Sequence, residues 1–177
     1  MQVDIIIKND KDYSNEYKRN IYNLLNDYHK EFISVKKSRI ISYCIIYEYL
    51  EIYNIELNIN DIYYSKNGKP LLNGLYFSIS NKDDLVVLAV SHYNVGVDIE
   101  RIINYDRRIV ENFFTNDEKN LVKTNYDFFR VFTLKESYIK MKDLKYDSYY
   151  IDDYNNYYNE TVKYKDYIIS YVIDVLK

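Results

Sequence analysis

Apolar residues recur in this sequence with two different periods, and this change of period limits the possible fold more than any other feature. A helical period, with apolar residues three or four positions apart, covers residues 15–29, 38–53 and 127–142. Strand-like apolar runs occupy residues 3–7, 62–65, 76–80, 85–91 and 95–100, and an alternating pattern continues from residue 146. Because helices and strands are mixed along the chain, we expect an α+β protein.

Each of the first two predicted helices has one apolar face that we expect to be buried. In the helix over residues 15–29, this face is formed by Tyr17, Ile21, Leu24, Leu25 and Tyr28. In the helix over residues 38–53, it is formed by Ile41, Ile45, Tyr49 and Ile52.

Short polar segments mark where these elements should turn or begin. Asn67-Gly68 predicts a turn, and Tyr93-Asn94 predicts a hairpin turn between the last two of the five strand-like runs. Thr115 followed three positions later by Glu118 is a capping box, so a helix should begin there. No linker rich in Pro, Gly or Ser and no clear internal repeat interrupts the chain, so we expect one structural unit.

Charge and cysteine content exclude several classes of protein. The formal net charge of −3 argues against a general nucleic-acid-binding protein. Cys44 is the single cysteine and lies in an apolar run, which favours a buried thiol over a disulfide or a nucleophile. Residues 1–8 are too short and too acidic for a signal peptide, and no apolar run approaches the length of a membrane span. We therefore expect a cytoplasmic protein that binds neither nucleic acid nor membrane.

Two carboxylates occur at alternate positions of the strand-like run Gly96-Val97-Asp98-Ile99-Glu100. Alternate residues of a strand point to the same face, so Asp98 and Glu100 should project together. Neighbouring carboxylates repel each other unless a cation or a proton lies between them. Oxygen ligands of this kind suit Mg²⁺, which usually completes its coordination with substrate phosphates. An exposed acidic strand end is the alternative interpretation of this segment.

A second pair of charges lies on the predicted helix over residues 127–142. Glu136 and Lys140 are four positions apart and therefore share one helical face. They could form an ordinary surface ion pair, which contributes little to stability. Alternatively, Glu136 could join a metal site or take a proton, while Lys140 neutralises charge on a pyrophosphate.

Basic and polar residues earlier in the chain could bind an anion. Lys36, Lys37 and Arg39 lie at the start of a predicted helix, where backbone N–H groups and the helix dipole add to their positive charge. Lys69 in its tight turn and the run Ser78 to Asn81 at a strand end could hold a phosphate or a sugar. A solvated helix end and ordinary loop residues are the alternatives.

In their order and spacing, these segments resemble the 4′-phosphopantetheinyl transferase superfamily. The motifs of this superfamily are a Gly-Lys-Pro turn, a strand ending near Ser-His, a Gly-x-Asp-x-Glu strand and a Trp/Phe-x-x-Lys-Glu-Ser/Ala-x-x-Lys helix. The corresponding segments here are Gly68-Lys69-Pro70, Ser80-Asn81, Gly96 to Glu100 and Phe132 to Lys140. The resemblance runs from about Lys36 to Lys140, and its length and Gly-Lys-Pro turn are similar to the surfactin-synthetase-activator type.

The resemblance implies roles for individual residues. The Mg²⁺ ion would be held by Asp98, Glu100 and Glu136. The pyrophosphate of coenzyme A would be contacted by Lys140, with help from Lys135. The adenosine and its 3′-phosphate would be contacted by Arg39, Lys69, Ser80 and Asn81, together with Lys36 and Lys37.

The resemblance also implies an architecture, partners and a reaction. Two similar α+β halves, residues 1–94 and 95–177, would form a pseudo-dimer with the active site in the cleft between them. The first half would hold the adenosine and 3′-phosphate of coenzyme A, and the second half would hold the metal and pyrophosphate. A serine of an acyl, peptidyl or polyketide carrier protein would attack the β-phosphorus, 3′,5′-ADP would leave, and Glu136 would receive the serine proton. We expect such a holo-[carrier protein] synthase to act as a monomer.

The sequence departs from the superfamily pattern at two places. Asn81 stands where a histidine usually follows Ser80, and residues 142–145 replace a Gly-rich segment after the helix. Asn81 and the short length of the chain leave a non-catalytic coenzyme A or nucleotide-binding protein as an alternative function. A module that binds partners through its 24 tyrosines is a further alternative, but it gives no reason for the spacing of the carboxylates.

Overall fold

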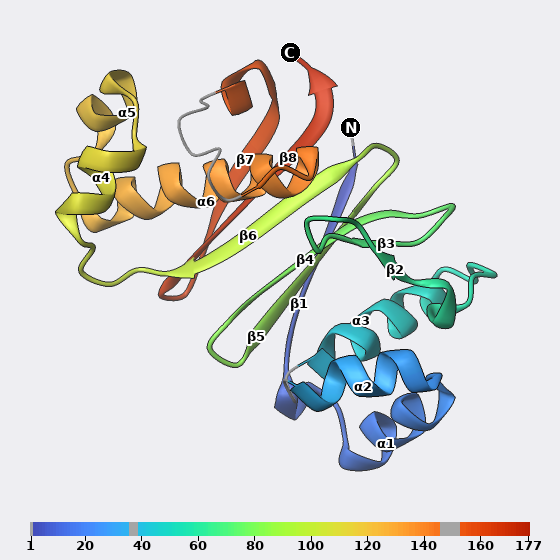
Figure 1. Ribbon diagram of the computed structural model, residues 1–177. Coiled ribbons are helices and arrows are strands. Elements are labelled where there is room, and N and C mark those ends of the chain that lie inside the picture. Colours follow the sequence, from blue (N-terminus) through green and yellow to red (C-terminus); the bar gives the residue numbers. More distant parts are fainter. Residues whose placement is uncertain (1, 36–38, 146–152) are drawn as a thin grey trace.

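The computed structural model describes residues 2–35, 39–145 and 153–177 and confirms an α+β fold. Figure 1 shows helices α1–α3 and helices α4–α6 on opposite sides of the molecule, with the strands between them. The expected similarity of two halves, divided between residues 94 and 95, stays a prediction. Among the described residues, no helix is both long and apolar enough to cross a membrane.

The first of two three-stranded sheets has the order β1–β5–β4, and both of its pairings are antiparallel. Its strands are β1 (Val3–Asn9), β4 (Tyr76–Lys82) and β5 (Leu85–Ser91). The helices of this part are α1 (Asn15–Leu24), α2 (Asp27–Val35) and α3 (Arg39–Ile52). The short hairpin consists of β2 (Tyr63–Tyr64) and β3 (Pro70–Leu71), and the single-turn helices are η1 (Asp10–Asp12) and η2 (Ile59–Asp61).

The second sheet has the order β6–β8–β7 and is also antiparallel. Its strands are β6 (Val95–Arg101), β7 (Tyr157–Tyr164) and β8 (Tyr167–Leu176). The helices of this part are α4 (Arg107–Phe113), α5 (Asn116–Leu121), α6 (Asn125–Lys142) and the short η4 (Asp153–Asn156).

The two sheets pack face to face, because strand alternation gives β5 two apolar faces. Its residues Val86, Leu88 and Val90 belong to the core shared with α1–α3. Its residues Leu85, Val87 and Ala89 belong to the core shared with β6 and β8. The remaining face of the second sheet packs against α6, since Phe128 and Ile168 share one core and Met141 and Val172 share another. The layers therefore run helix, sheet, sheet, helix.

Gly96 allows α6 to approach β6 closely. A Cβ atom at this position would lie 1.9 Å from the carbonyl oxygen of Ser137 and 2.5 Å from the amide nitrogen of Met141. No side chain fits this space without moving the backbone of α6. The close approach brings the alternate residues Asp98 and Glu100 to the side of β6 that α6 covers.

The helix predicted over residues 15–29 is wrong in its extent, because it is two helices separated at Leu25 and Asn26. The side chain of Asn60 hydrogen-bonds to the backbone at the break: its Oδ1 accepts from the amide of Asn26 at 2.7 Å, and its Nδ2 donates to the carbonyl of Leu24 at 3.0 Å. The expected apolar face is therefore interrupted. Leu25 is buried, whereas Leu24 and Tyr28 are 51% and 56% exposed.

The hairpin predicted at Tyr93-Asn94 is also wrong. Strand β5 pairs with β1 and β4, and β6 pairs with β8, so residues 92–94 cross from one sheet to the other. The second predicted helix is confirmed as α3, and its residues Ile41, Ile45 and Tyr49 are buried, but Ile52 is 65% exposed. The other predicted strands, the turn at Asn67-Gly68, the capping box and the third helix are confirmed within the described residues.

Candidate functional site

A pocket of about 520 Å³ lies where β4, β6, α6 and the turn before β3 come together. Eight of the residues to which the resemblance assigns a role line it: Arg39, Lys69, Ser80, Asn81, Asp98, Glu100, Glu136 and Lys140. Lys36 and Lys37 lie outside the described residues. These eight residues come from segments up to about 100 positions apart in the sequence, so only the packing of the two sheets and α6 brings them together.

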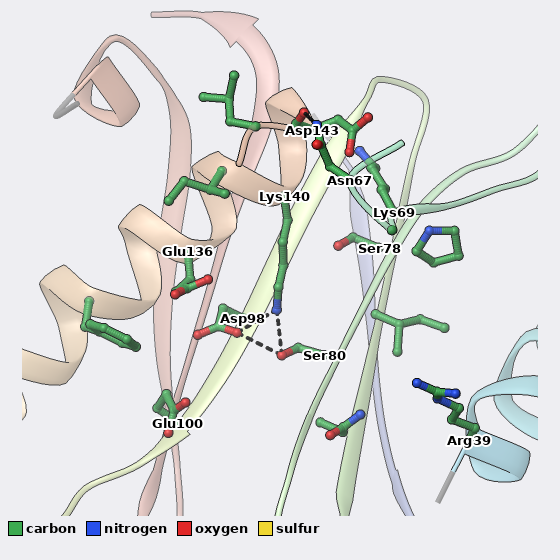
Figure 2. Close-up of a pocket in the computed structure, with 17 residues that line it drawn as sticks. Arg39, Asn67, Lys69, Ser78, Ser80, Asp98, Glu100, Glu136, Lys140 and Asp143 are labelled. Carbon is green, nitrogen blue, oxygen red and sulfur yellow. Dashed lines mark hydrogen bonds and ion pairs between the residues drawn. The ribbon is translucent and has the colours of Figure 1, made fainter. Parts of the chain in front are cut away.

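Three carboxylates gather on one side of this pocket. Asp98 and Glu100 come from β6, and Glu136 comes from the neighbouring face of α6 (Figure 2). Asp98 and Glu136 are buried, and the Oδ2 atom of Asp98 has no hydrogen-bond partner within the described part of the chain. An uncompensated buried carboxylate oxygen is costly, so this atom is positioned to accept a cation or a donor.

Burial and the charges of neighbouring carboxylates raise the pKa values of Glu100 and Glu136. Burial, followed by the charges of Asp98 and Glu100, raises the pKa of Glu136 to about 7, although Lys140 opposes the shift. Burial also raises the pKa of Glu100, with a contribution from Asp98, while the ammonium of Lys82 at 2.5 Å lowers it. On this side of the pocket, the three carboxyl groups therefore outnumber the two ammonium groups, those of Lys82 and Lys140, that pair with them.

Lys140 and Ser80 hold one oxygen of Asp98. The Lys140 ammonium donates to Asp98 Oδ1 at 2.7 Å, to Ser80 Oγ at 2.9 Å and to the carbonyl of Val97 at 3.2 Å. The hydroxyl of Ser80 donates to the same Oδ1 atom at 2.8 Å. Figure 2 shows Lys140 extending from α6 toward both residues. These hydrogen bonds join β4 of the first sheet to β6 of the second sheet and to α6.

Arg39 supplies positive charge on the opposite side of the pocket from Glu136 (Figure 2). It is the first residue of α3. Its guanidinium lies 3.7 Å from the centre of the Phe32 ring, and Nη1 donates to the carbonyl of Phe32 at 2.7 Å. Both contacts restrain the guanidinium, so the pocket has an acidic side and a fixed basic side.

Residues 94–170 match the family model of the 4′-phosphopantetheinyl transferase superfamily. The chain is 34% identical to 4′-phosphopantetheinyl transferase gsp of Aneurinibacillus migulanus over 145 residues, a match that covers 71% of this chain and 61% of that protein. The chain belongs to the 4′-phosphopantetheinyl transferase superfamily.

Two further members of the superfamily match shorter parts of the chain. 4′-Phosphopantetheinyl transferase psf-1 of Bacillus pumilus is 37% identical over 84 residues, which is 42% of this chain and 36% of that protein. 4′-Phosphopantetheinyl transferase ffp of Bacillus subtilis is 33% identical over 98 residues, which is 49% of this chain and 44% of that protein. The chain thus matches less than two thirds of the length of each of these relatives.

Lys135 does not line the pocket, in contrast to what the superfamily motif implies. Its side chain is 1% exposed, and its ammonium donates to both carboxylate oxygens of Glu118 at 2.8 Å. The hydroxyl of Tyr154 also donates to Glu118, at 3.0 Å. Because the ammonium of Lys135 is buried and paired with Glu118, away from the pocket, we do not assign Lys135 to coenzyme A. Lys69 lines the pocket, but its ammonium donates to protein oxygens.

Lys82 is a residue of this region that sequence reasoning missed, and the contact that Ser78 makes between the two sheets was not predicted. Ser78 lines the pocket, and its hydroxyl accepts from the amide of Val97 at 3.1 Å, which ties β4 to β6. Lys82 forms the ion pair with Glu100. Both residues lie two positions from Ser80 on β4, so the alternation of side chains along a strand could have placed them on the same face.

The acidic side of the pocket suits a divalent cation in its chemistry. Three carboxylates, one with a buried unpartnered oxygen, form an oxygen-donor set of the kind that Mg²⁺ prefers. In the present arrangement, no group of three or more His, Cys, Asp or Glu side chains among the described residues is disposed to hold a metal ion. The ammonium groups of Lys140 and Lys82 lie against Asp98 and Glu100 instead, so a cation would have to displace them or share these carboxylates.

Proposed function

We propose that this chain transfers the 4′-phosphopantetheine group of coenzyme A to a serine of an acyl, peptidyl or polyketide carrier protein and releases 3′,5′-ADP. The observation that carries this proposal is one pocket with three carboxylates and Lys140 on one side and Arg39 on the other. Coenzyme A has a pyrophosphate and a separate 3′-phosphate, and this separation of charges suits a pocket with two charged regions. Membership of the superfamily supports the same activity.

Asp98, Glu100 and Glu136 would hold a magnesium ion against the pyrophosphate. When bound, the ion would neutralise negative charge on the phosphate oxygens and stabilise the leaving group. Lys140, which already contacts Asp98, would add a positive charge to the same oxygens. Positioning and charge neutralisation supply most of the catalysis in phosphoryl transfer.

Glu136 is the group that we assign to proton transfer. The carrier serine must lose its proton as its oxygen attacks the β-phosphorus, and a base with a pKa near the working pH is the most effective acceptor. In the metal-free chain, burial raises the pKa of Glu136 to about 7, and a bound cation would lower it and keep the carboxylate ionised and able to accept a proton. Its carboxylate would receive the proton of the attacking hydroxyl, while the departing 3′,5′-ADP keeps the electrons of the broken P–O bond.

The two parts of the chain would divide the recognition of coenzyme A. Arg39, Ser80 and Asn81 belong to residues 1–94 and would contact the adenosine and its 3′-phosphate. Residues 95–177 would hold the metal and the pyrophosphate. We further infer that these two parts are the similar halves of a pseudo-dimer, because each contributes one three-stranded antiparallel sheet with helices against it.

The direct test is mass spectrometry of several apo carrier proteins incubated with the chain, coenzyme A and Mg²⁺. We expect a mass increase of one phosphopantetheine group on the carrier serine, and a serine-to-alanine carrier is the control. The same reaction in excess chelator should give no product. Coenzyme A binding without transfer to any carrier would contradict the proposal and identify a non-catalytic binding protein.

A further inference from the structure

The turn between β2 and β3, residues 65–69, contacts the C-terminal end of α6. The hydroxyl of Ser65 donates to Asp143 Oδ1 at 2.7 Å, and Asn67 Nδ2 donates to the carbonyl of Asp143 at 2.5 Å. Asp143 is the C-cap residue directly after α6, in the left-handed conformation with φ of 52°. These contacts link positions more than 70 residues apart in sequence, and Figure 2 shows Asn67, Lys69 and Asp143 at the same end of the pocket.

Lys69 adds a buried ammonium to this contact. Its Nζ atom donates to Asn94 Oδ1 at 2.6 Å, to the carbonyl of Val95 at 3.2 Å and to the carbonyl of Met141 at 3.3 Å. The amide of Asn94 donates to the same Met141 carbonyl at 2.6 Å. The last carbonyls of a helix carry partial negative charge and lack partners within the helix, so a cation is favourable there.

These contacts use the whole hydrogen-bonding capacity of the Lys69 side chain. An ammonium has three N–H bonds and no acceptor, and three protein oxygens lie within hydrogen-bond distance of Lys69 Nζ. The residue is also 9% exposed. A phosphate of coenzyme A could reach this ammonium only if one of the protein contacts broke.

We propose that Lys69 and the turn at residues 65–69 fix the last turn of α6, and that Lys69 does not bind coenzyme A. Lys140 lies in that last turn, one residue before Met141. The turn would therefore determine where the Lys140 ammonium lies relative to Asp98, and Lys69 is a positioning residue. The expected effect of Lys69 on phosphopantetheine transfer rests on the proposed function, whereas the contact between residues 65–69 and the end of α6 does not.

Hydrogen exchange tests the contact without any assumption about activity. In Lys69→Met, the amides of residues 140–144 should exchange about tenfold faster or more, because charge-assisted hydrogen bonds to the helix end are lost. Ser65→Ala should increase exchange in the same segment and provides a second variant if Lys69→Met does not fold. Lys66→Met is the matched control, since Lys66 is an exposed lysine of the same turn. Exchange in β8 should be unchanged in all three variants.

Ligand binding separates a positioning role from direct contact. 3′,5′-ADP carries the adenosine and the 3′-phosphate, so its affinity, measured by titration calorimetry, reports on that part of the site. We expect Lys69→Met to bind 3′,5′-ADP within about twofold of the unmodified chain, and in transfer assays to lower kcat while leaving KM for coenzyme A nearly unchanged.

Two results would overturn this inference. The first is unchanged exchange over residues 140–144 in both Lys69→Met and Ser65→Ala. The second is a tenfold or greater loss of 3′,5′-ADP affinity in Lys69→Met without a change in exchange, which would make Lys69 a ligand-binding residue. If the unmodified chain transfers nothing, the proposed function fails, while the exchange result still decides whether the turn fixes α6.

Discussion

Lys140 pairs with only one of the two carboxylate oxygens of Asp98. The ammonium lies 2.7 Å from Oδ1, whereas Oδ2 is buried without a hydrogen-bond partner in the described part of the chain. Because a buried carboxylate oxygen normally has a partner, this ion pair leaves Oδ2 of Asp98 as an acceptor for a second cation.

Asp98→Asn and Glu136→Gln should each lower kcat for transfer by about 100-fold or more. Both changes keep the size of the side chain and remove one of the charges that we assign to the metal and to proton transfer. Circular dichroism and urea unfolding serve as controls for the fold. If both variants fold and keep near-normal turnover, the assignment of the acidic side is wrong.

Lys82→Met should raise the affinity of the chain for Mg²⁺ by about two- to fivefold, as measured by titration calorimetry without coenzyme A. The Lys82 ammonium lies 2.5 Å from Glu100 and competes with a metal for this carboxylate, but the pair is partly exposed, so its contribution is small. Lys163→Met, which removes an exposed charge from β7, is the control. An affinity equal to that of the unmodified chain would mean that Lys82 and the metal do not compete.

The free energy of unfolding of the metal-free chain should depend on pH through Glu136. The pKa of this residue is raised from its ordinary value of 4.5 to about 7, so the folded chain binds more protons than the unfolded chain between these two values. The contribution of Glu136 to stability therefore falls as pH rises through this window. Glu136→Gln should become progressively more stable than the unmodified chain over the same window, by at most about 3 kcal/mol.

Urea unfolding in chelator at several values between about pH 5 and about pH 8 measures this difference. Glu56→Gln, at an exposed glutamate, controls for the loss of one carboxyl group. A difference between Glu136→Gln and the unmodified chain that stays constant with pH would contradict the prediction, because it would show that Glu136 does not titrate in this window.

Asn81→His should lower KM for coenzyme A several-fold and change kcat little. Asn81 and Arg39 both line the pocket, away from the carboxylates, and a histidine there could make a charge-assisted hydrogen bond to the 3′-phosphate. Such bonds contribute about 1 kcal/mol more than neutral ones, which is somewhat less than tenfold in affinity. Dephospho-coenzyme A lacks the 3′-phosphate and should show no comparable gain. An equal gain for both donors would place residue 81 away from that phosphate.

The double variant Arg107→Glu with Arg108→Glu should raise KM for the carrier protein several-fold and leave KM for coenzyme A unchanged. Carrier proteins of these systems are usually acidic, both arginines lie on α4, and the basic residues Lys119 and Lys123 follow in the sequence. Arg108 already pairs with Asp106 at 2.9 Å, so Arg107→Glu alone should give most of the effect. An unchanged KM for the carrier would place the docking surface elsewhere.

The sequence by itself determined relationships that depend only on local geometry. The strand period placed Asp98 and Glu100 on one face of β6, and the helical period placed Glu136 and Lys140 on one face of α6. Both hold because side-chain direction within an element follows from its backbone repeat. The capping box at Thr115 is of the same kind, since its two partners are three residues apart.

The tertiary structure decided everything that depends on partners distant in sequence. Asn60 hydrogen-bonds to the backbone where the first predicted helix is interrupted, and Lys135 forms a buried ion pair with Glu118. The ammonium of Lys69 donates to the carbonyl of Met141 and to the side chain of Asn94. The residues around each of these side chains in the sequence do not predict its contact, because the partner lies many positions away. A lysine that is exposed to solvent and a lysine that is buried against a distant partner look alike in sequence. The burial that distinguishes them arises only when the two sheets and α6 pack together.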